Sequence, residues 1–210
     1  ALMLGTCDSI RTCKSIDVGD LLERFRAWAK QGKYTPDGVV FDIGGTTSYG
    51  IALGKGQDDF YSNGNGSLMR IAPLAFCGAT DDEICEVSAI THAHEISLNA
   101  CMKFVHILRE ADIDSEALRE RLVAEYGTKS RSDIDSGGFV LNTYSAALWC
   151  FATTSTYKDC VLRAVNLGSD TDTTACVAGA LAGTVYGMDS IPREWIEALR
   201  GKDIIEQVLF

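Results

Sequence analysis

Two aspartates and a threonine stand close together in GSDTDTT, at residues 168–174. Asp170 and Asp172 are two positions apart and Thr173 follows, in what should be the first turn of an Ala- and Gly-rich helix. Three oxygen ligands of this kind suit a hard cation such as Mg²⁺, Mn²⁺ or Ca²⁺ rather than zinc or copper. The alternative is that Ser169, Asp170 and Asp172 only cap the helix and complement its dipole. An isolated Asp-x-Asp-Thr favours the cap, so the choice depends on the other motifs.

A segment rich in glycine and asparagine, NGNGSLMRIAPLAF at residues 63–76, leads through Ser67 into an apolar helix. Such a turn exposes backbone N–H groups and a helix N-terminus, which can hold phosphates without basic side chains. The spacing of a Walker loop is absent. An ordinary turn with a helix cap is the simpler alternative for this segment.

Two further segments place a functional side chain beside glycines. In FDIGGTTSYG, at residues 41–50, Asp42 could act as a general base, orient a ligand or only form a turn. In DSGGFVLNTYSAALWCF, at residues 135–151, Phe139 follows a Ser-Gly-Gly turn at the start of an apolar helix. Its ring could stack on a sugar or a base, and packing into the core is the alternative.

The histidines offer one candidate ligand contact. His92 and His94 in THAH cannot share one helix face, because residues two apart point in different directions. At most one of them should face a ligand, and we expect it to be His92. A histidine satisfied within the core or at the surface is the alternative, and we interpret His106 as structural.

The elements that must position these residues are helices. Apolar residues recur with helical spacing and alternating strand patterns are almost absent, so we predict an all-α fold. The helix behind Asp172 carries glycines at positions 179, 183 and 187, where another helix can approach closely. Asp17 or Asp20 could cap the second helix, and Asp114 or Ser115 the sixth. The predicted helices cover about 2–14, 19–31, 67–76, 81–94, 96–111, 115–126, 139–152, 156–167, 171–187 and 192–198.

Two long stretches, residues 34–66 and 127–138, interrupt this helical rhythm and are rich in glycine or polar residues. Long loops in a helical domain are more often functional than accidental, so we place the ligand-facing chemistry there. The length of 210 residues, without a linker or repeat, predicts a single domain over residues 1–210.

Composition limits the partners. The formal net charge of −10 argues against nucleic acid, because binding its backbone needs clustered Lys and Arg. An anionic ligand would have to be held by metal ions, helix N-termini or backbone amides. The longest apolar stretch, residues 175–188, is too short to span a bilayer, and we expect no membrane partner. The eight cysteines form no C-x-x-C pair, so we expect reduced thiols and a cytoplasmic protein.

Taken together and in this order, the motifs resemble the ADP-ribosylglycohydrolase family, which includes the dinitrogenase-reductase-activating glycohydrolases and other ADP-ribosyl-acceptor hydrolases. The resemblance runs from DLLERFRAWAKQGKYTPDGVVFDIGGTT (residues 20–47) through NGSLMRIAPLAF and THAH to GSDTDTTACVAGALAGTVYG (residues 168–187). It implies a compact orthogonal bundle of helices with two Mg²⁺ or Mn²⁺ ions at one end of a cleft. The implied activity is hydrolysis of the glycosidic bond that joins ADP-ribose to a protein side chain or small-molecule acceptor.

The resemblance also assigns roles to single residues. Asp170, Asp172 and Thr173 would be metal ligands, and Asp42 and Asp172 the carboxylates that assist proton transfer at a metal-activated water. Residues 64–67 would follow the pyrophosphate, and Phe139 would line the adenosine side. The implied ligand-binding residues are Gly44, Gly64, Asn65, Gly66, Ser67, His92, Gly138, Phe139, Gly168 and Ser169.

Two departures from the family pattern accompany this prediction. The family carries an N-terminal segment with an Asp-Asp-Thr motif that supplies further metal ligands, and this sequence begins where the residues after that motif would stand. Gly45 occupies a position that is often Asn. A catalytically inactive relative that binds ADP-ribose or is purely structural is therefore the alternative, and an unrelated metal-assisted hydrolase with the same Asp-x-Asp-Thr is a third.

Overall fold

Helices make up all the regular structure of the protein. The computed structural model describes residues 1–210 and contains eleven α-helices, five 3-10 turns and no β-strand, which confirms the all-α prediction. None of the helices combines the length and the apolar character that crossing a membrane requires. The α-helices are α1 (Leu2–Cys13), α2 (Val18–Gln31), α3 (Gly45–Leu53), α4 (Asp81–Ala89), α5 (Glu95–Ile113), α6 (Ser115–Tyr126), α7 (Val140–Ala152), α8 (Tyr157–Val165), α9 (Thr171–Tyr186), α10 (Arg193–Ala198) and α11 (Lys202–Val208).

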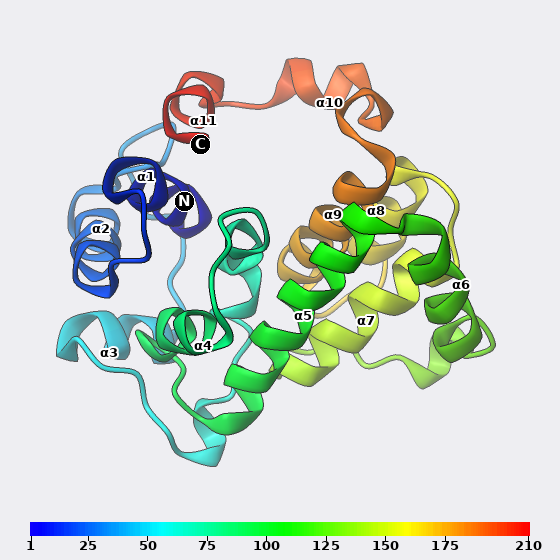
Figure 1. The fold of residues 1–210 in the computed structure, drawn as a ribbon, viewed down its shortest axis with the longest axis horizontal. Coiled ribbons are helices and arrows are strands. Elements are labelled where there is room, and N and C mark those ends of the chain that lie inside the picture. The colour runs from blue at the N-terminus through cyan, green and yellow to red at the C-terminus, as the bar shows by residue number, and fades with distance from the viewer.

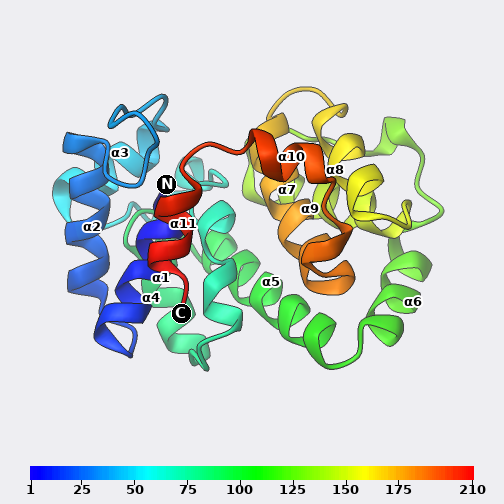
Figure 2. The same ribbon diagram turned by 90° about the horizontal axis from the view of Figure 1, so that it is seen from above.

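The helices form two groups joined by α5. Helices α1 to α4 lie on one side, α5 runs diagonally through the middle, and α6 to α9 lie on the other side (Figure 1). The chain after α9 crosses back over the molecule through α10, and α11 packs on α1 (Figure 2). A cluster of 39 buried residues extends through both groups, from Ile10 in α1 to Ala182 in α9. The candidate loops are therefore attached to one continuous core.

Helix α9 carries the Asp-x-Asp-Thr motif at its start and is held by α5, α7 and α8. A side chain added at Gly179 would lie 3.5 Å from the hydroxyl of Tyr157 in α8, and one at Gly183 would lie 3.8 Å from the same ring. Gly187 instead ends α9 with a positive φ of 76°. The small residues thus let α8 approach closely, as predicted for the first two glycines.

Local signals fixed most helix boundaries within one or two residues of the prediction. Asp17 caps α2 by accepting a hydrogen bond from the Asp20 N–H, and Asp114 caps α6 by accepting one from Ala117. The structure thereby chooses between the two candidate caps at each helix. These side-chain oxygens satisfy N–H groups that have no partner within the helix.

Four segments differ from the prediction. Residues 67–76 form two 3-10 turns, Leu68–Arg70 and Ala72–Ala75, instead of one helix, because Pro73 lacks an N–H and restricts the residue before it. The helix predicted over 81–94 ends at Ala89. Helices α3 and α11 were not predicted. The sequence of α3, GTTSYGIAL, contains glycine, threonine and serine, which have low helix propensity.

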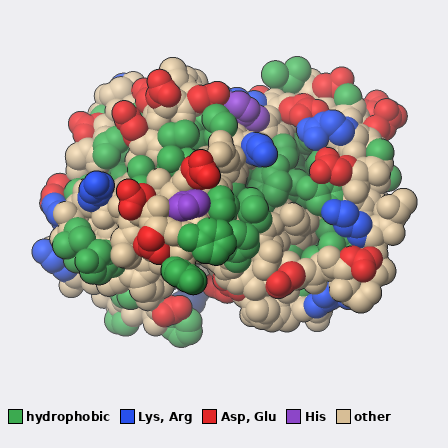
Figure 3. Space-filling view, turned by 90° about the horizontal axis from the view of Figure 1, so that it is seen from below, with side chains coloured by type: hydrophobic (Ala, Val, Ile, Leu, Met, Phe, Trp, Pro, Cys, Tyr) green, Lys and Arg blue, Asp and Glu red, His purple; other side chains and the backbone are tan.

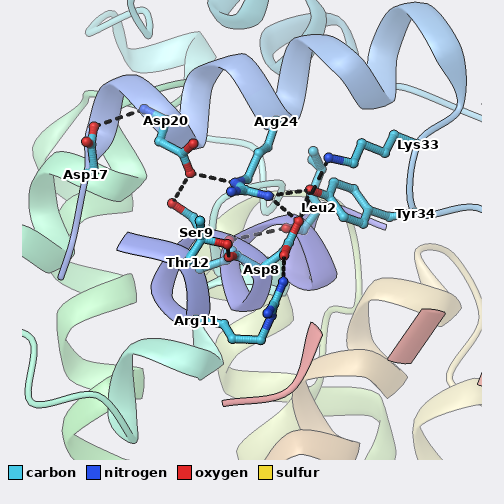
Figure 4. A network of polar contacts seen from close by, with 11 residues as sticks. Leu2, Asp8, Ser9, Arg11, Thr12, Asp17, Asp20, Arg24, Lys33 and Tyr34 are labelled. Carbon is cyan, nitrogen blue, oxygen red and sulfur yellow. Dashed lines mark hydrogen bonds and ion pairs between the residues drawn. The ribbon is translucent and has the colours of Figure 1, made fainter. Parts of the chain in front are cut away.

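A network of polar side chains ties α1 to α2 (Figure 4). Asp8 accepts hydrogen bonds from the Tyr34 hydroxyl at 2.8 Å and from Arg11 at 2.8 Å, and it pairs with Arg24. Arg24 also binds Asp20. Burial alone would raise the pKa of Asp8, but the hydrogen bonds from Arg11 and Tyr34 and the charge of Arg24 outweigh it and lower the pKa. The network therefore stabilises the folded protein through an ionised carboxylate.

Candidate ligand-binding and metal site

Two of the glycine-rich loops pair with each other along their backbones. Gly64 and Phe139 form an isolated antiparallel bridge. The Asn65 N–H donates to the Gly138 carbonyl at 3.0 Å, and the Val140 N–H donates to the Asn63 carbonyl at 2.9 Å. Segments about 75 residues apart in the sequence thus form one surface, as expected if both contact the same ligand.

The loop before α9 joins this surface. The Asp170 N–H donates to the Ser136 carbonyl at 3.1 Å, and the Ser136 hydroxyl donates to the Gly168 carbonyl at 2.9 Å. Ser169 adopts a positive φ of 59°, which is uncommon for a residue other than glycine. The three loops at residues 63–67, 135–139 and 168–170 therefore form one continuous rim, which we call the three-loop rim.

Asn65 holds the rim together through its side chain. Its amide nitrogen donates to the Asp170 carboxylate at 2.7 Å and to the Thr143 hydroxyl at 2.7 Å. Asn65 is buried, and a side chain on Gly138 would lie 3.3 Å from the same Asp170 oxygen. The prediction that Asn65 touches ligand is untested. Both hydrogen bonds that its side-chain amide nitrogen can donate are made to other residues of the protein.

Asp170 occupies the N-cap position of α9 but makes no capping hydrogen bond. Its carboxylate turns away from its own helix and binds Asn65. Asp172, in the first turn, is exposed and accepts no hydrogen bond, and Thr173 is buried. The simple capping interpretation of Asp170 is therefore wrong, because its side chain accepts no hydrogen bond from the N–H groups of α9.

The donors at the start of α9 fit a magnesium or manganese ion only as part of a shell. No group of three or more His, Cys, Asp or Glu side chains lies close enough to hold a metal. The donors available at this point are the carboxylates of Asp170 and Asp172 and the hydroxyl of Thr173. Mg²⁺ is usually held by one or two carboxylates while water or substrate fills its other positions. The oxygen chemistry is therefore compatible with such an ion.

An open pocket of about 480 Å³ lies against the rim. Its lining contains no Lys or Arg and consists of Phe60, Tyr61, Asn63, Gly64, Gly138, Phe139 and Asn142. Phe60 packs against Tyr61, Phe139 and His94, with ring centroids 5.9 to 6.4 Å apart. In Figure 3 hydrophobic side chains gather beside a histidine near the middle of this face. An aromatic wall of this kind can stack on a flat ring.

His92 lies beneath the loop rather than in the pocket. It is 1% exposed, and its ring contacts the positions that side chains on Gly64 and Gly66 would occupy. Its Nδ1 is 2.7 Å from the Thr91 hydroxyl. Burial, helped by the positive charge of Arg70, lowers the pKa of His92 to about 3, so the ring is neutral at physiological pH. His94 begins α5 by accepting a hydrogen bond from the Ile96 N–H. His106 pairs with Asp81 at the surface.

The loop at residues 66–68 presents three free amides. The N–H groups of Gly66, Ser67 and Leu68 have no protein acceptor. The hydroxyl of Ser67 is buried beside the thiol of Cys101, at 3.4 Å. Buried N–H groups without partners are rare, and successive free amides form a site for anions. Ser67 and Leu68 are fully buried, so of the three residues only the half-buried Gly66 reaches the surface.

Asp42 lies in an exposed extended segment ahead of α3. Its only hydrogen bond is the one that it accepts from the Ile43 N–H. Gly44 and Gly45 begin α3 and have open space around them. No contact joins Asp42 to the three-loop rim, although Thr47 of the same helix packs against Gly66. The structure brings together most of the predicted ligand-binding residues but leaves Asp42 apart.

Several residues at the site were not singled out from the sequence. Phe60, Tyr61 and Asn142 line the pocket, and Asn63 is anchored by the Ser97 hydroxyl at 2.8 Å. The dipeptide Phe60-Tyr61, separated from NGNG by Ser62 alone, was the available signal. A larger hollow of about 600 Å³, beside Trp149 and Arg163, contains none of the predicted site residues.

The sequence of the chain is similar to those of known proteins. A sequence model described as ADP-ribosylglycohydrolase matches residues 1–209. The ADP-ribosylarginine hydrolase Tri1 of Pseudomonas putida (strain GB-1) is 32% identical over 86% of this chain and 56% of its own length. The ADP-ribosyl-[dinitrogen reductase] glycohydrolase of Rhodospirillum rubrum is 33% identical over 88% of this chain and 67% of its own length.

The fold is also similar to that of a solved structure. A solved structure described as an ADP-ribosylglycohydrolase-related protein complex superposes with a TM-score of 0.77 and 25% identity, over 99% of this chain and 77% of the other. This chain spans just over half of the length of the Pseudomonas relative and two thirds of the Rhodospirillum one.

Proposed function

The chain belongs to the ADP-ribosylglycohydrolase family, and from this premise we propose that it hydrolyses the glycosidic bond joining ADP-ribose to a modified protein side chain or small acceptor. The observation that carries the proposal is the three-loop rim, whose backbone bonds join the loop with unpaired amides, the loops that line the aromatic pocket and the start of α9 with its carboxylates. These three features would take the diphosphate, the adenosine and the ribose end of the substrate, respectively.

The aromatic pocket suits the adenosine. Phe60, Tyr61 and Phe139 offer ring faces, while Asn63 and Asn142 add polar groups that can orient a base or a ribose. Pockets of this kind, mostly apolar with a few polar groups, are typical of small-molecule sites. The half-buried backbone of Gly64 and Gly66, in the same loop, would take the diphosphate.

We propose that Asp170, Asp172 and Thr173 contribute ligands to Mg²⁺ or Mn²⁺, with two ions in the complete site. When bound, such an ion polarises the sugar and lowers the pKa of a coordinated water. Asn65 fixes the position of the Asp170 carboxylate by its 2.7 Å hydrogen bond. The exposed Asp172 carboxylate is available for a ligand or a proton.

The chain's own residues would orient the substrate so that water reaches the anomeric carbon. Asp172 or Asp42 would accept a proton from that water as its oxygen bonds to the anomeric carbon. The bond from that carbon to the acceptor would break, and the acceptor would leave carrying the proton. Asp42 has no partner beyond the Ile43 N–H, so its carboxylate remains free for this role. Two relatives are named ADP-ribosylarginine hydrolases, and an arginine linkage is the acceptor to test first. The four buried free thiols favour a reducing compartment, and a cytoplasmic location is part of the proposal.

The test is the release of ADP-ribose from arginine-linked and serine-linked ADP-ribosyl peptides, with Mg²⁺ and with EDTA. We expect magnesium-dependent release that Asp172→Ala abolishes and that Asp189→Ala, an exposed control beyond the other end of α9, leaves unchanged. Full activity in Asp172→Ala would contradict the metal assignment. ADP-ribose binding without any turnover would instead support a binding protein that lacks catalysis.

A further inference from the structure

Arg70 is a fully buried cation without a carboxylate partner. It is 0% exposed, its guanidinium lies 5.0 Å from the centre of the Phe25 ring, and it takes part in no ion pair. Burial lowers its pKa to about 10, so the group stays charged at neutral pH. A buried charge destabilises a fold unless it is paired or serves another purpose. The position of Arg70 therefore requires an explanation beyond packing.

Arg70 contacts the loop at residues 66–68. Its Nη1 donates to the Gly66 carbonyl at 2.8 Å and its Nη2 donates to the Val87 carbonyl at 3.1 Å, while Nε has no partner. Every peptide bond in the chain is trans, and in a trans peptide the C=O and the following N–H point in opposite directions. Because the Gly66 carbonyl faces Arg70, the Ser67 N–H faces away from it.

Arg70 supplies positive charge to a loop that has no other cation beside it. The chain carries a net charge of −10, and no Lys or Arg lines the adjacent pocket. The 3-10 turn that follows the loop has three residues, too few to provide a helix dipole. Arg70, directly behind the loop, is the cation that the contacts place next to it.

We propose that Arg70 is a positioning residue that holds the Gly66–Ser67 peptide in place and gives the half-buried surface of Gly64 and Gly66 the positive potential that a diphosphate requires. The inference rests on the proposed function, because the diphosphate is that of the ADP-ribosyl substrate. Arg70 acts through the backbone and does not touch the ligand.

The test separates the diphosphate from the rest of the ligand by comparing the Kd values of ADP-ribose and adenosine. With a phosphate roughly 8 Å from the charge and an effective dielectric constant of about 20, Arg70→Met should weaken ADP-ribose binding on the order of ten- to thirtyfold. Adenosine binding should change by less than about twofold. Arg109→Met is the matched control. Arg109 also donates hydrogen bonds to main-chain carbonyls, but these belong to Leu74, Ala75 and Ala79, which lie outside the loop.

Equal losses for ADP-ribose and adenosine in Arg70→Met would overturn the proposal and leave Arg70 a structural role. Should Arg70→Met fail to fold, Arg70→Lys provides the comparison: it keeps the charge, so the ratio of the two Kd values should stay near that of the wild type, and a collapse of that ratio would contradict the electrostatic role.

Inorganic pyrophosphate distinguishes this inference from the proposed function. If the wild type binds pyrophosphate with NMR shifts at the Gly64 and Gly66 amides but does not bind ADP-ribose, the role of Arg70 stands and the proposed function fails. If pyrophosphate leaves these amides unchanged, the inference is wrong whatever the substrate.

Discussion

Gly66 offers a direct test of how tightly the loop is built. An added Cβ would lie 2.7 Å from the Thr47 hydroxyl oxygen and 3.0 Å from Cε1 of His92. Contacts below about 3.4 Å require the neighbour to move, and both neighbours are buried. His92 is further restrained by its 2.7 Å contact with Thr91. The Gly66→Ala variant should therefore be overpacked.

Overpacking of this kind destabilises a fold by about 1–3 kcal/mol, and the lower entropy of the unfolded alanine chain returns about 0.4–1 kcal/mol. We expect a net loss of about 0.5–2 kcal/mol, or a Tm lowered by roughly 1–8 °C for a domain of this size. Thermal unfolding followed by circular dichroism measures the shift directly.

Gly64→Ala is the matched control in the same loop. Its added Cβ would come no closer than 3.4 Å, to Nε2 of His92, which is ordinary contact. The Tm of Gly64→Ala should therefore equal or exceed that of the wild type. A second variant, Thr47→Ala, removes the nearest atom and should recover part of the loss in Gly66→Ala. The steric reasoning is refuted if Gly66→Ala and Gly64→Ala unfold at the same temperature.

Two further variants test the polar contacts. Asn65→Asp places a carboxylate 2.7 Å from that of Asp170, and in metal-free buffer it should lower the free energy of unfolding by about 2–4 kcal/mol. The deficit should shrink at pH 4.5 or with Mg²⁺, and a pH-independent deficit would speak against charge repulsion. Asp8→Asn should lower it by about 1–3 kcal/mol at pH 7, because the lowered pKa of Asp8 means that its ionised form stabilises the fold. That contribution is complete above the ordinary carboxyl pKa of about 4 and is lost as the pH falls through the lower folded-state pKa, so the difference in stability between wild type and variant should shrink steadily as the pH falls below about 4.

The sequence predicted the helices because their signals are local. Helix α5 shows apolar residues three and four apart, and Asp17 and Asp114 cap their helices through N–H groups three residues away. Helix α3 was missed for the same reason. Its Gly- and Thr-rich sequence has little intrinsic preference for a helix, so tertiary packing of Thr47 and Ile51 decides its conformation.

The sequence predicted which loops would lie together but not how their side chains are arranged. The motifs at residues 63–67, 135–139 and 168–170 do meet, as their common assignment required. The sequence placed His92 toward the ligand, whereas the structure buries it under Gly64 and Gly66. The role of Asp42 and the metal ligands remain predictions, since the structure joins Asp42 to no other site residue.

The sequence by itself determined that the protein is all-α and identified the loops that carry its chemistry, because helix periodicity and glycine-rich turns depend on neighbours within a few positions. Only the tertiary structure decided which side chains meet. The bond from Asn65 to Asp170 joins residues 105 positions apart, and the bond from Asn65 to Thr143 joins residues 78 apart. Such contacts arise from the packing of α5, α7 and α9 against one another, and no local pattern encodes them. The Asp-x-Asp-Thr segment is recognisable in the sequence, but only the fold shows that Asp170 turns from its own helix to Asn65.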